Sequence, residues 1–235
     1  MVTIGPNTSL ASSLSTRVPE GSILGPRTYI TYAEDVQEIF ELQRVMYHLF
    51  ADDMQGHASA KPLNVRSITL NLQECIIAIS SWCTSKHLQL NAKKTEVLWF
   101  RSVVNLRNVS HADRCLTIGS DVIEPVEIVR DLGVYFDTHL TMKAHIARVS
   151  RTCFYHLRHL RSIQGCLARE VTAKLVSAYI ISRLDYCNCI LANLPVSTLA
   201  PMQRVLNAAA RLVMNLGSRD HMTPALYELH WLPIQ

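Results

Sequence analysis

The chain has 235 residues, 49% hydrophobic and 18% charged, a balance that excludes an intrinsically disordered protein. Its formal net charge of +4 is unevenly distributed: residues 1–140 carry 12 Lys/Arg and 15 Asp/Glu, whereas residues 141–235 carry 11 and 4. The second part therefore has an excess of positive charge, which suits a polyanionic partner.

The seven cysteines include no CxxC pair, and most lie in apolar stretches where a free thiol packs as a small hydrophobe. Cys187 and Cys189 are two residues apart, but no second pair stands at a metal-ligand spacing. We therefore expect free thiols in a reducing compartment, nucleus or cytoplasm, and not a secreted protein. We expect no signal peptide and no membrane span, because the apolar runs are far shorter than about 20 residues.

The first segments combine a turn-rich stretch with a helix. Residues 18–26, VPEGSILGP, contain Gly21 and Gly25, which permit conformations or close approaches that a side chain would block. A plain connecting turn is the alternative interpretation of this stretch. The pattern over 27–43 then predicts a helix.

A hairpin is predicted next, with a strand at 45–50 and its partner at 54–58. Asp52 and Asp53 then lie at its tip, where the turn allows neighbouring side chains to approach one point. Two adjacent carboxylates repel each other unless a hard divalent cation such as Mg²⁺ binds both. The alternative is a solvated acidic turn, since Asp is a common turn residue.

Further elements follow in chain order. Apolar residues at helical spacing predict a helix over 65–83 that serves packing. Lys93 and Lys94 precede a strand predicted at 96–100. Three more strands are predicted at 116–118, 121–123 and 130–137.

From residue 141 the pattern becomes helical. The first of these helices has an apolar seam at Ile146, Val149, Cys153, Leu157 and Leu160. The opposite side carries His145, Arg148, Arg151, Tyr155 and Arg158. Such a stripe suits a phosphate backbone, with Tyr155 available for stacking, although a solvated helix face is the alternative. Two more helices are predicted at 170–184 and 199–216.

Four motifs occur in order: VPEGSILGP at 18–26, FADD at 50–53, LNAKKTE at 90–96 and RDLGVYFD at 130–137. This order resembles the reverse transcriptase of non-LTR (LINE-type) retrotransposons. The segments SRLDYCNCILANLP, MQRVLNAAARLV and ELHWLPI are similar to the region that follows the polymerase core in those elements. The resemblance covers nearly the whole chain.

The resemblance implies an α+β fold: a partial polymerase palm of antiparallel sheet plus helices over 1–140, then an all-helical thumb-like region over 141–235. It implies an RNA-directed DNA polymerase with an RNA template, a DNA primer and Mg²⁺. Asp52 is then the principal metal ligand and Asp53 its companion, with Phe50 at the aromatic position before them. Gly21 and Ser22 would lie close to the nucleotide and template.

The resemblance also places Lys93 or Lys94 near the triphosphate, and we favour Lys94. The strand at 130–137 would support the primer side. The helices after 141 would grip the duplex through residues such as Arg148, Arg151, Tyr155 and Arg158.

The chain departs from the family pattern at its start. Residues 1–17 contain no Asp or Glu, although the resemblance implies a further metal-binding Asp upstream of the Gly–Ser loop. Glu20 and Arg17 stand where the family usually has Gln and Gly. We therefore expect a truncated fragment that is inactive on its own. A non-catalytic nucleic-acid-binding remnant is the alternative, and a poorly folding gene fragment is a third.

Overall fold

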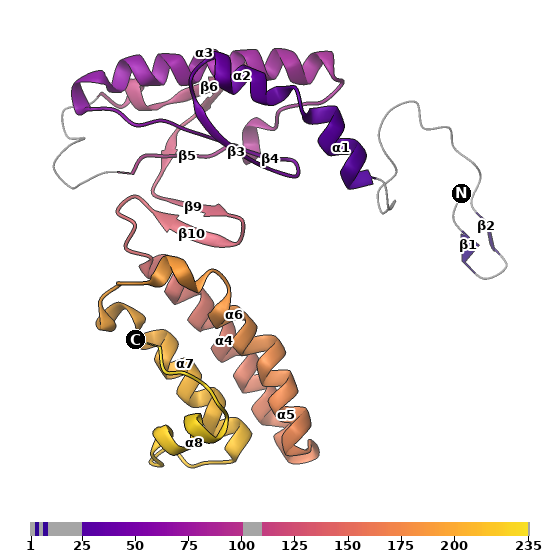
Figure 1. Ribbon diagram of the computed structural model, residues 1–235, viewed down its shortest axis with the longest axis vertical. Coiled ribbons are helices and arrows are strands. Elements are labelled where there is room, and N and C mark those ends of the chain that lie inside the picture. Colours follow the sequence, from indigo (N-terminus) through magenta and orange to yellow (C-terminus); the bar gives the residue numbers. More distant parts are fainter. Residues whose placement is uncertain (1–2, 5–6, 9–24, 101–109, 235) are drawn as a thin grey trace. The chain divides into compact units, whose positions relative to one another are not determined.

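The computed structural model describes residues 3–4, 7–8, 25–100 and 110–234 (Figure 1). The chain divides into two compact units, residues 1–97 with 104–125 and residues 98–103 with 126–235. The boundary expected at 140/141 falls inside the second unit, because Val134 and Phe136 pack into that unit's helical core. Strands β5 (Val97–Leu98) and β8 (Pro125–Val126) straddle the division.

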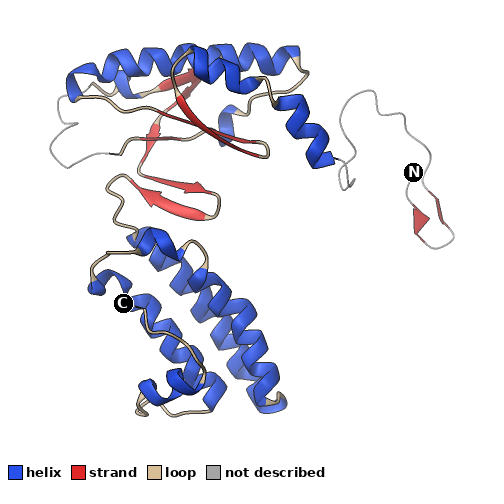
Figure 2. Cartoon of the chain, in the orientation of Figure 1, coloured by secondary structure: helices blue, strands red, loops and turns tan. Residues whose placement is uncertain are grey.

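The first unit combines helices with two-stranded antiparallel sheets (Figure 2). Its other elements are β1 (Thr3–Ile4), β2 (Asn7–Thr8), α1 (Gly25–Ala33), α2 (Val36–Leu42), β3 (Met46–Phe50), β4 (Asp53–His57), α3 (Val65–Ser85), β6 (Leu116–Ile118) and β7 (Asp121–Ile123), with short 3-10 turns at Pro62–Asn64, Ala92–Lys94 and Ala112–Arg114. The helix predicted over 27–43 is interrupted between α1 and α2. At the interruption, the Asp35 carboxylate accepts a hydrogen bond from the Trp82 indole (3.0 Å) and pairs with Lys86 (2.8 Å), contacts that no helical periodicity reveals.

The core of the first unit lies between α2, β3 and α3. Its buried residues are Val36, Phe40, Val45, Cys75, Ile79 and Cys83. Each apolar side chain buried in this way contributes about 1.5–3 kcal/mol. The helix predicted over 65–83 is confirmed as α3, and the buried Cys75, Ile79 and Cys83 repeat at its helical spacing.

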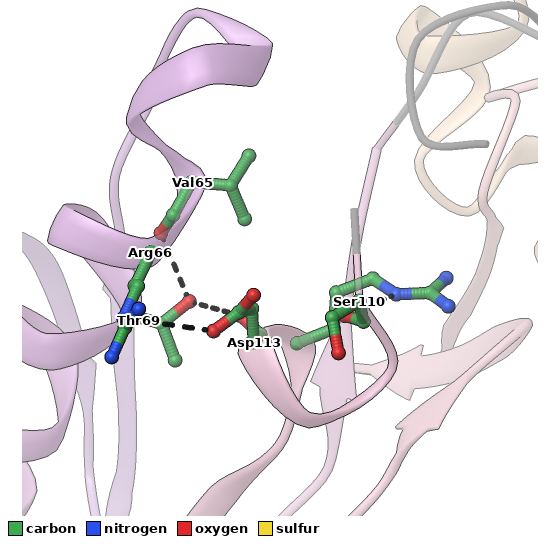
Figure 3. A network of polar contacts seen from close by, with 6 residues as sticks. Val65, Arg66, Thr69, Ser110 and Asp113 are labelled. Carbon is green, nitrogen blue, oxygen red and sulfur yellow. Dashed lines mark hydrogen bonds and ion pairs between the residues drawn. The ribbon is translucent and has the colours of Figure 1, made fainter. Parts of the chain in front are cut away.

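Polar side chains join α3 to the chain segment at 110–117, and Figure 3 shows the contacts at Asp113. The Thr69 hydroxyl lies 2.7 Å from the Asp113 carbonyl oxygen and 3.1 Å from that of Val65. One turn further along α3, the Gln73 amide makes two hydrogen bonds with the Thr117 backbone, at 2.9 and 2.7 Å. The Gln73 side chain thus pairs with the backbone of β6 as another strand would.

Residues 130–137, predicted as one strand, form a hairpin instead. Strand β9 (Ile128–Asp131) pairs with β10 (Val134–Asp137) across a two-residue turn at Leu132–Gly133. Leu132 and Gly133 have φ of 42° and 88°, the pattern of a type I′ turn. The strands predicted at 116–118 and 121–123 are confirmed as β6 and β7.

The second unit is mainly helical. Its helices are α4 (Lys143–Ile163), α5 (Arg169–Val176), α6 (Ser182–Asp185), α7 (Val196–Met214) and α8 (Met222–Glu228), with a π-helical segment at Ser177–Ile181 and 3-10 turns at Gln164–Cys166 and Asn188–Leu191. Cys153, Val176, Ile180, Val205 and Ala209 are fully buried in its core. Within the described ranges, no helix is both long enough and apolar enough to span a membrane.

Candidate functional site

The Asp52–Asp53 pair lies at the tip of the β3–β4 hairpin. Phe50 pairs with Asp53, so Ala51 and Asp52 form a two-residue turn. Ala51 has a left-handed φ of 53°, which favours glycine. Asp52 therefore sits in the turn and Asp53 begins β4, and both side chains are exposed. The predicted hairpin is confirmed. Because Asp52 lies in the turn, its side chain and that of Asp53 need not point to opposite faces, as neighbours within a strand do.

The hairpin is held on α2 by its aromatic residues. The rings of Phe40 and Tyr47 stack with centroids 5.0 Å apart. Tyr47 pairs with Gly56 across the hairpin, and a Cβ at Gly56 would lie 3.4 Å from Phe40 and from Val45. Gly56 thus leaves room for Phe40 of α2 and for Val45 against β4. Sequence patterns alone did not single out Tyr47 or Gly56.

Helix α1 brings a further group near the hairpin tip. The pKa of Tyr29 is raised from its ordinary value, first by burial and then by the nearby Asp52 carboxylate, with Cys83 acting in the same direction. Asp52 is therefore close enough to α1 to act on this hydroxyl electrostatically. A cation bound at Asp52 would oppose that effect.

The tip suits Mg²⁺ in the type of its donors but supplies few of them. Carboxylate oxygens are the ligands this hard cation prefers. Yet no group of three or more His, Cys, Asp or Glu side chains that could hold a metal occurs among residues 25–100 and 110–234. Asp52 and Asp53 alone would therefore supply only part of a Mg²⁺ coordination sphere.

The other residues predicted to contact nucleotide do not all lie at the hairpin tip. Phe50 is 57% exposed beside the aspartates. Lys94 is exposed at the end of the 3-10 turn that Asn91 caps by accepting from the Lys93 backbone N–H at 3.1 Å. Lys93 lines an open cleft of about 600 Å³ that residues 50–53 do not line. Gly21 and Ser22 lie outside the described residues.

Helix α4 carries the predicted nucleic-acid contacts on one exposed face. Arg148, Arg151, Tyr155 and Arg158 are all exposed, and the seam opposite them is buried. The helix contains five Lys/Arg and no Asp/Glu. In the described part of the chain, no carboxylate forms an ion pair with these three arginines. Their charges are thus available to an external anion.

His145 does not belong to that face, and its placement on the basic stripe is wrong. The side chain is 3% exposed, and its Nδ1 accepts a hydrogen bond from the Tyr135 backbone N–H at 3.4 Å. Burial lowers the pKa of His145, so it adds no positive charge at neutral pH. The Tyr135 ring instead makes a cation–π contact with Arg148, whose guanidinium lies 4.7 Å from the ring centroid.

Comparison with known proteins finds relatives among polymerases of mobile elements. The chain is 23% identical over 195 residues to the probable RNA-directed DNA polymerase from transposon BS of Drosophila melanogaster, covering 81% of this chain and 20% of that protein. It is 27% identical over 145 residues to the RNA-directed DNA polymerase from mobile element jockey of the same species, covering 57% and 14%. The jockey polymerase of Drosophila funebris is 24% identical over 179 residues, covering 72% and 18%.

The resemblance found in the motifs is thereby confirmed: this chain is related to the RNA-directed DNA polymerases of non-LTR transposable elements. It spans a fifth or less of the length of the curated relatives it matches. No protein-family model matches the chain, and no solved structure gives a significant match.

Proposed function

We propose that this chain is a segment of a non-LTR retrotransposon RNA-directed DNA polymerase, with a partial palm followed by a thumb-like helical region. The observation that carries the proposal is the exposed position of Asp52 and Asp53, within the FADD motif, at a hairpin tip. The polymerase relatives support the same assignment. RNA template and DNA primer are the partners that this function requires.

The chemistry assigned to the hairpin is nucleotidyl transfer. Asp52 and Asp53 would hold Mg²⁺, which when bound stabilises negative charge on the attacking and leaving oxygens. Phe50 exposes an aromatic ring beside them for contact with nucleotide or template. Lys94 is the cation we assign to the triphosphate. Gly21 and Ser22 would contribute to the same nucleotide site.

We expect the chain alone to be inactive. Mg²⁺ demands near-octahedral oxygen ligation, and the two tip carboxylates supply only part of it. Because positioning and electrostatic stabilisation provide most of the catalysis in phosphoryl transfer, an incomplete metal site is a severe loss. The tip should therefore bind a divalent cation weakly and support no primer extension.

A nucleic-acid-binding remnant is a second candidate, favoured by the acid-free exposed face of α4. Arg148, Arg151 and Arg158 would then contact phosphates without any chemistry. Both candidates predict salt-dependent binding to an RNA–DNA hybrid. Only the polymerase assignment requires the two aspartates to bind a metal.

The test of the metal assignment uses Mn²⁺ as a paramagnetic probe in NMR spectra of the full chain. Mn²⁺ should broaden the amide signals of residues 50–54, and Asp52→Asn combined with Asp53→Asn should abolish the effect. The matched control is Asp121→Asn, because Asp121 also follows a two-residue hairpin turn and is exposed. Equal broadening in the parent and the double variant would overturn the assignment.

Primer extension on an annealed RNA template tests the expected inactivity. A folded parent chain with Mg²⁺ should give no product. Product formation that Asp52→Asn abolishes would show that the ligand set is complete and that the inactivity proposal is wrong.

A further inference from the structure

Four aromatic rings form a continuous array beside the arginines of α4. The Tyr155 ring makes T-shaped pairs with His159 and with His156, with centroids 4.4 and 5.4 Å away. His156 in turn stacks on Tyr179 of the π-helical segment, at 5.3 Å and an interplanar angle of 25°. We call these four residues the ring array. It joins α4 to the segment 177–181, so its geometry is fixed by two packed elements.

The ring array is open to solvent on its outer side. Tyr155 is 53% exposed and Tyr179 45% exposed, and His159 is also exposed. Rings this large are usually buried when their only role is packing. Grouped exposed rings are typical of surfaces that bind a partner.

Positive charge surrounds the array. Arg151 and Arg158 lie one turn before and after Tyr155 on the exposed face of α4, and that helix carries no carboxylate. Arg183, four residues after Tyr179, is close enough to His156 to lower its pKa. Asp185, two residues after Arg183, accepts a 2.7 Å hydrogen bond from the Asn188 amide, a neutral donor, so it is one carboxylate against the three arginines. The field around the rings therefore favours an anionic partner.

His156 acts in this array as a neutral ring. Burial lowers its pKa first, and the charges of Arg183 and His159 lower it further. At neutral pH the imidazole can therefore stack on Tyr179 as an uncharged aromatic ring, which preserves the array.

We propose that the ring array binds an unpaired strand of nucleic acid, with bases stacked on Tyr155 and Tyr179 and phosphates held by the neighbouring arginines. A duplex keeps its bases stacked on each other and offers a protein its edges and backbone, so base stacking on the exposed Tyr155 and Tyr179 rings requires an unpaired strand. The inference rests on the proposed function for its class of partner. It adds a binding site for single-stranded nucleic acid. A protein that contacts only the phosphates of a duplex would not need such a site.

The experiment measures fluorescence anisotropy of the full chain with a labelled oligo-U RNA and with a blunt RNA–DNA hybrid. In the double variant Tyr155→Ala/Tyr179→Ala, the affinity for oligo-U should fall at least about tenfold for each base that no longer stacks. Its affinity for the hybrid should fall less than its affinity for oligo-U, because the arginines of α4 that face duplex phosphates are retained. The double variant Tyr155→Phe/Tyr179→Phe keeps both rings and should bind oligo-U like the parent.

Tyr227→Ala is the matched control, because Tyr227 is 84% exposed on α8 of the same unit. It should leave both affinities unchanged, and circular dichroism melts confirm that each variant is folded. Unchanged oligo-U binding by the Ala double variant would overturn the inference, as would an equal loss in the Phe variant. A third variant replaces Arg148, Arg151 and Arg158 with Ala. If it binds the hybrid like the parent while oligo-U binding still needs the tyrosines, the duplex assignment alone is rejected.

Discussion

The Tyr186 hydroxyl donates a 2.6 Å hydrogen bond to the carbonyl oxygen of Leu132. The two residues are 54 positions apart and belong to different motifs, Leu132 to RDLGVYFD and Tyr186 to SRLDYCNCILANLP. Gly133 lies against the same ring, since a Cβ there would be 3.4 Å from Tyr186 Cε1. The β9–β10 turn is therefore anchored to the helical part of the second unit.

Removing this anchor should destabilise the second unit modestly. Tyr186→Phe deletes a hydrogen bond on a half-exposed side chain and should lower the free energy of unfolding by about 0.5–1 kcal/mol. Gly133→Ala should cost more, about 1–2 kcal/mol, because φ is 88° at that position. Urea denaturation measures both values. A larger loss for Tyr186→Phe than for Gly133→Ala would contradict the strain argument.

The tip of the β3–β4 hairpin should gain stability from a glycine. Ala51 occupies a φ of 53° that Gly adopts without steric cost, so Ala51→Gly should stabilise the chain by roughly 0.5–1 kcal/mol. Gly119 has a φ of 61° in the β6–β7 turn, and a Cβ there would meet no residue other than its chain neighbours within 4 Å, so it provides the reverse control. Gly119→Ala should destabilise by a similar amount in the same thermal melts. A lower melting temperature for Ala51→Gly would contradict this account.

Stability should fall with acid because of His145. Burial lowers its folded-state pKa, so the unfolded chain takes up the proton first, near its ordinary value of about 6.5. The free energy of unfolding should therefore decrease as the pH falls below that value, until the pH reaches the lowered pKa. His145→Gln should flatten this dependence, and His221→Gln, at an exposed position, should not. His156, whose pKa is also lowered, should leave a residual slope.

The cysteines should differ sharply in reactivity. Burial raises the pKa of Cys153 to about 11, with Arg183 acting in the opposite direction. Cys166 and Cys189 are exposed. Iodoacetamide at mildly alkaline pH should therefore modify Cys166 and Cys189 first and Cys153 only after unfolding, because the thiolate is the reactive form. Mass spectrometry over time follows each site, and early modification of Cys153 would contradict its burial.

Periodic patterns predicted α3, α4 and the β3–β4 hairpin, but not the break between α1 and α2. The seam of α4 and the packing face of α3 follow from apolar spacing alone, because burial of one helix face imposes that spacing. The β3–β4 hairpin was predictable from its apolar strand followed by an acidic turn. The exposure of Arg148, Arg151, Tyr155 and Arg158 followed from the same helical geometry.

Tertiary contacts explain the features that local patterns did not predict. Helical spacing assigns His145 to the basic stripe, but its Nδ1 accepts a hydrogen bond from the Tyr135 backbone N–H. Tyr135 lies on a strand, and the spacing of residues along a helix carries no information about such a neighbour. The turn at Leu132–Gly133 was not predicted because Leu132 is unusual at positive φ, although Gly133 was a usable signal. Gly56 and Tyr47 matter through the approach of α2, which no local pattern reveals.

The most direct test of the central claim is the affinity of the full chain for an RNA–DNA hybrid across a range of salt concentrations. Replacing Arg148, Arg151 and Arg158 with Ala should weaken binding and reduce the salt slope by roughly 0.7–0.9 for each phosphate that is no longer neutralised. A control with the exposed Lys174, Arg204 and Arg219 replaced by Ala removes the same charge elsewhere in the unit. We predict a clear loss of affinity in the first variant and near-parent binding in the control. Equal losses in both, or no salt-dependent binding by the parent, would contradict the account.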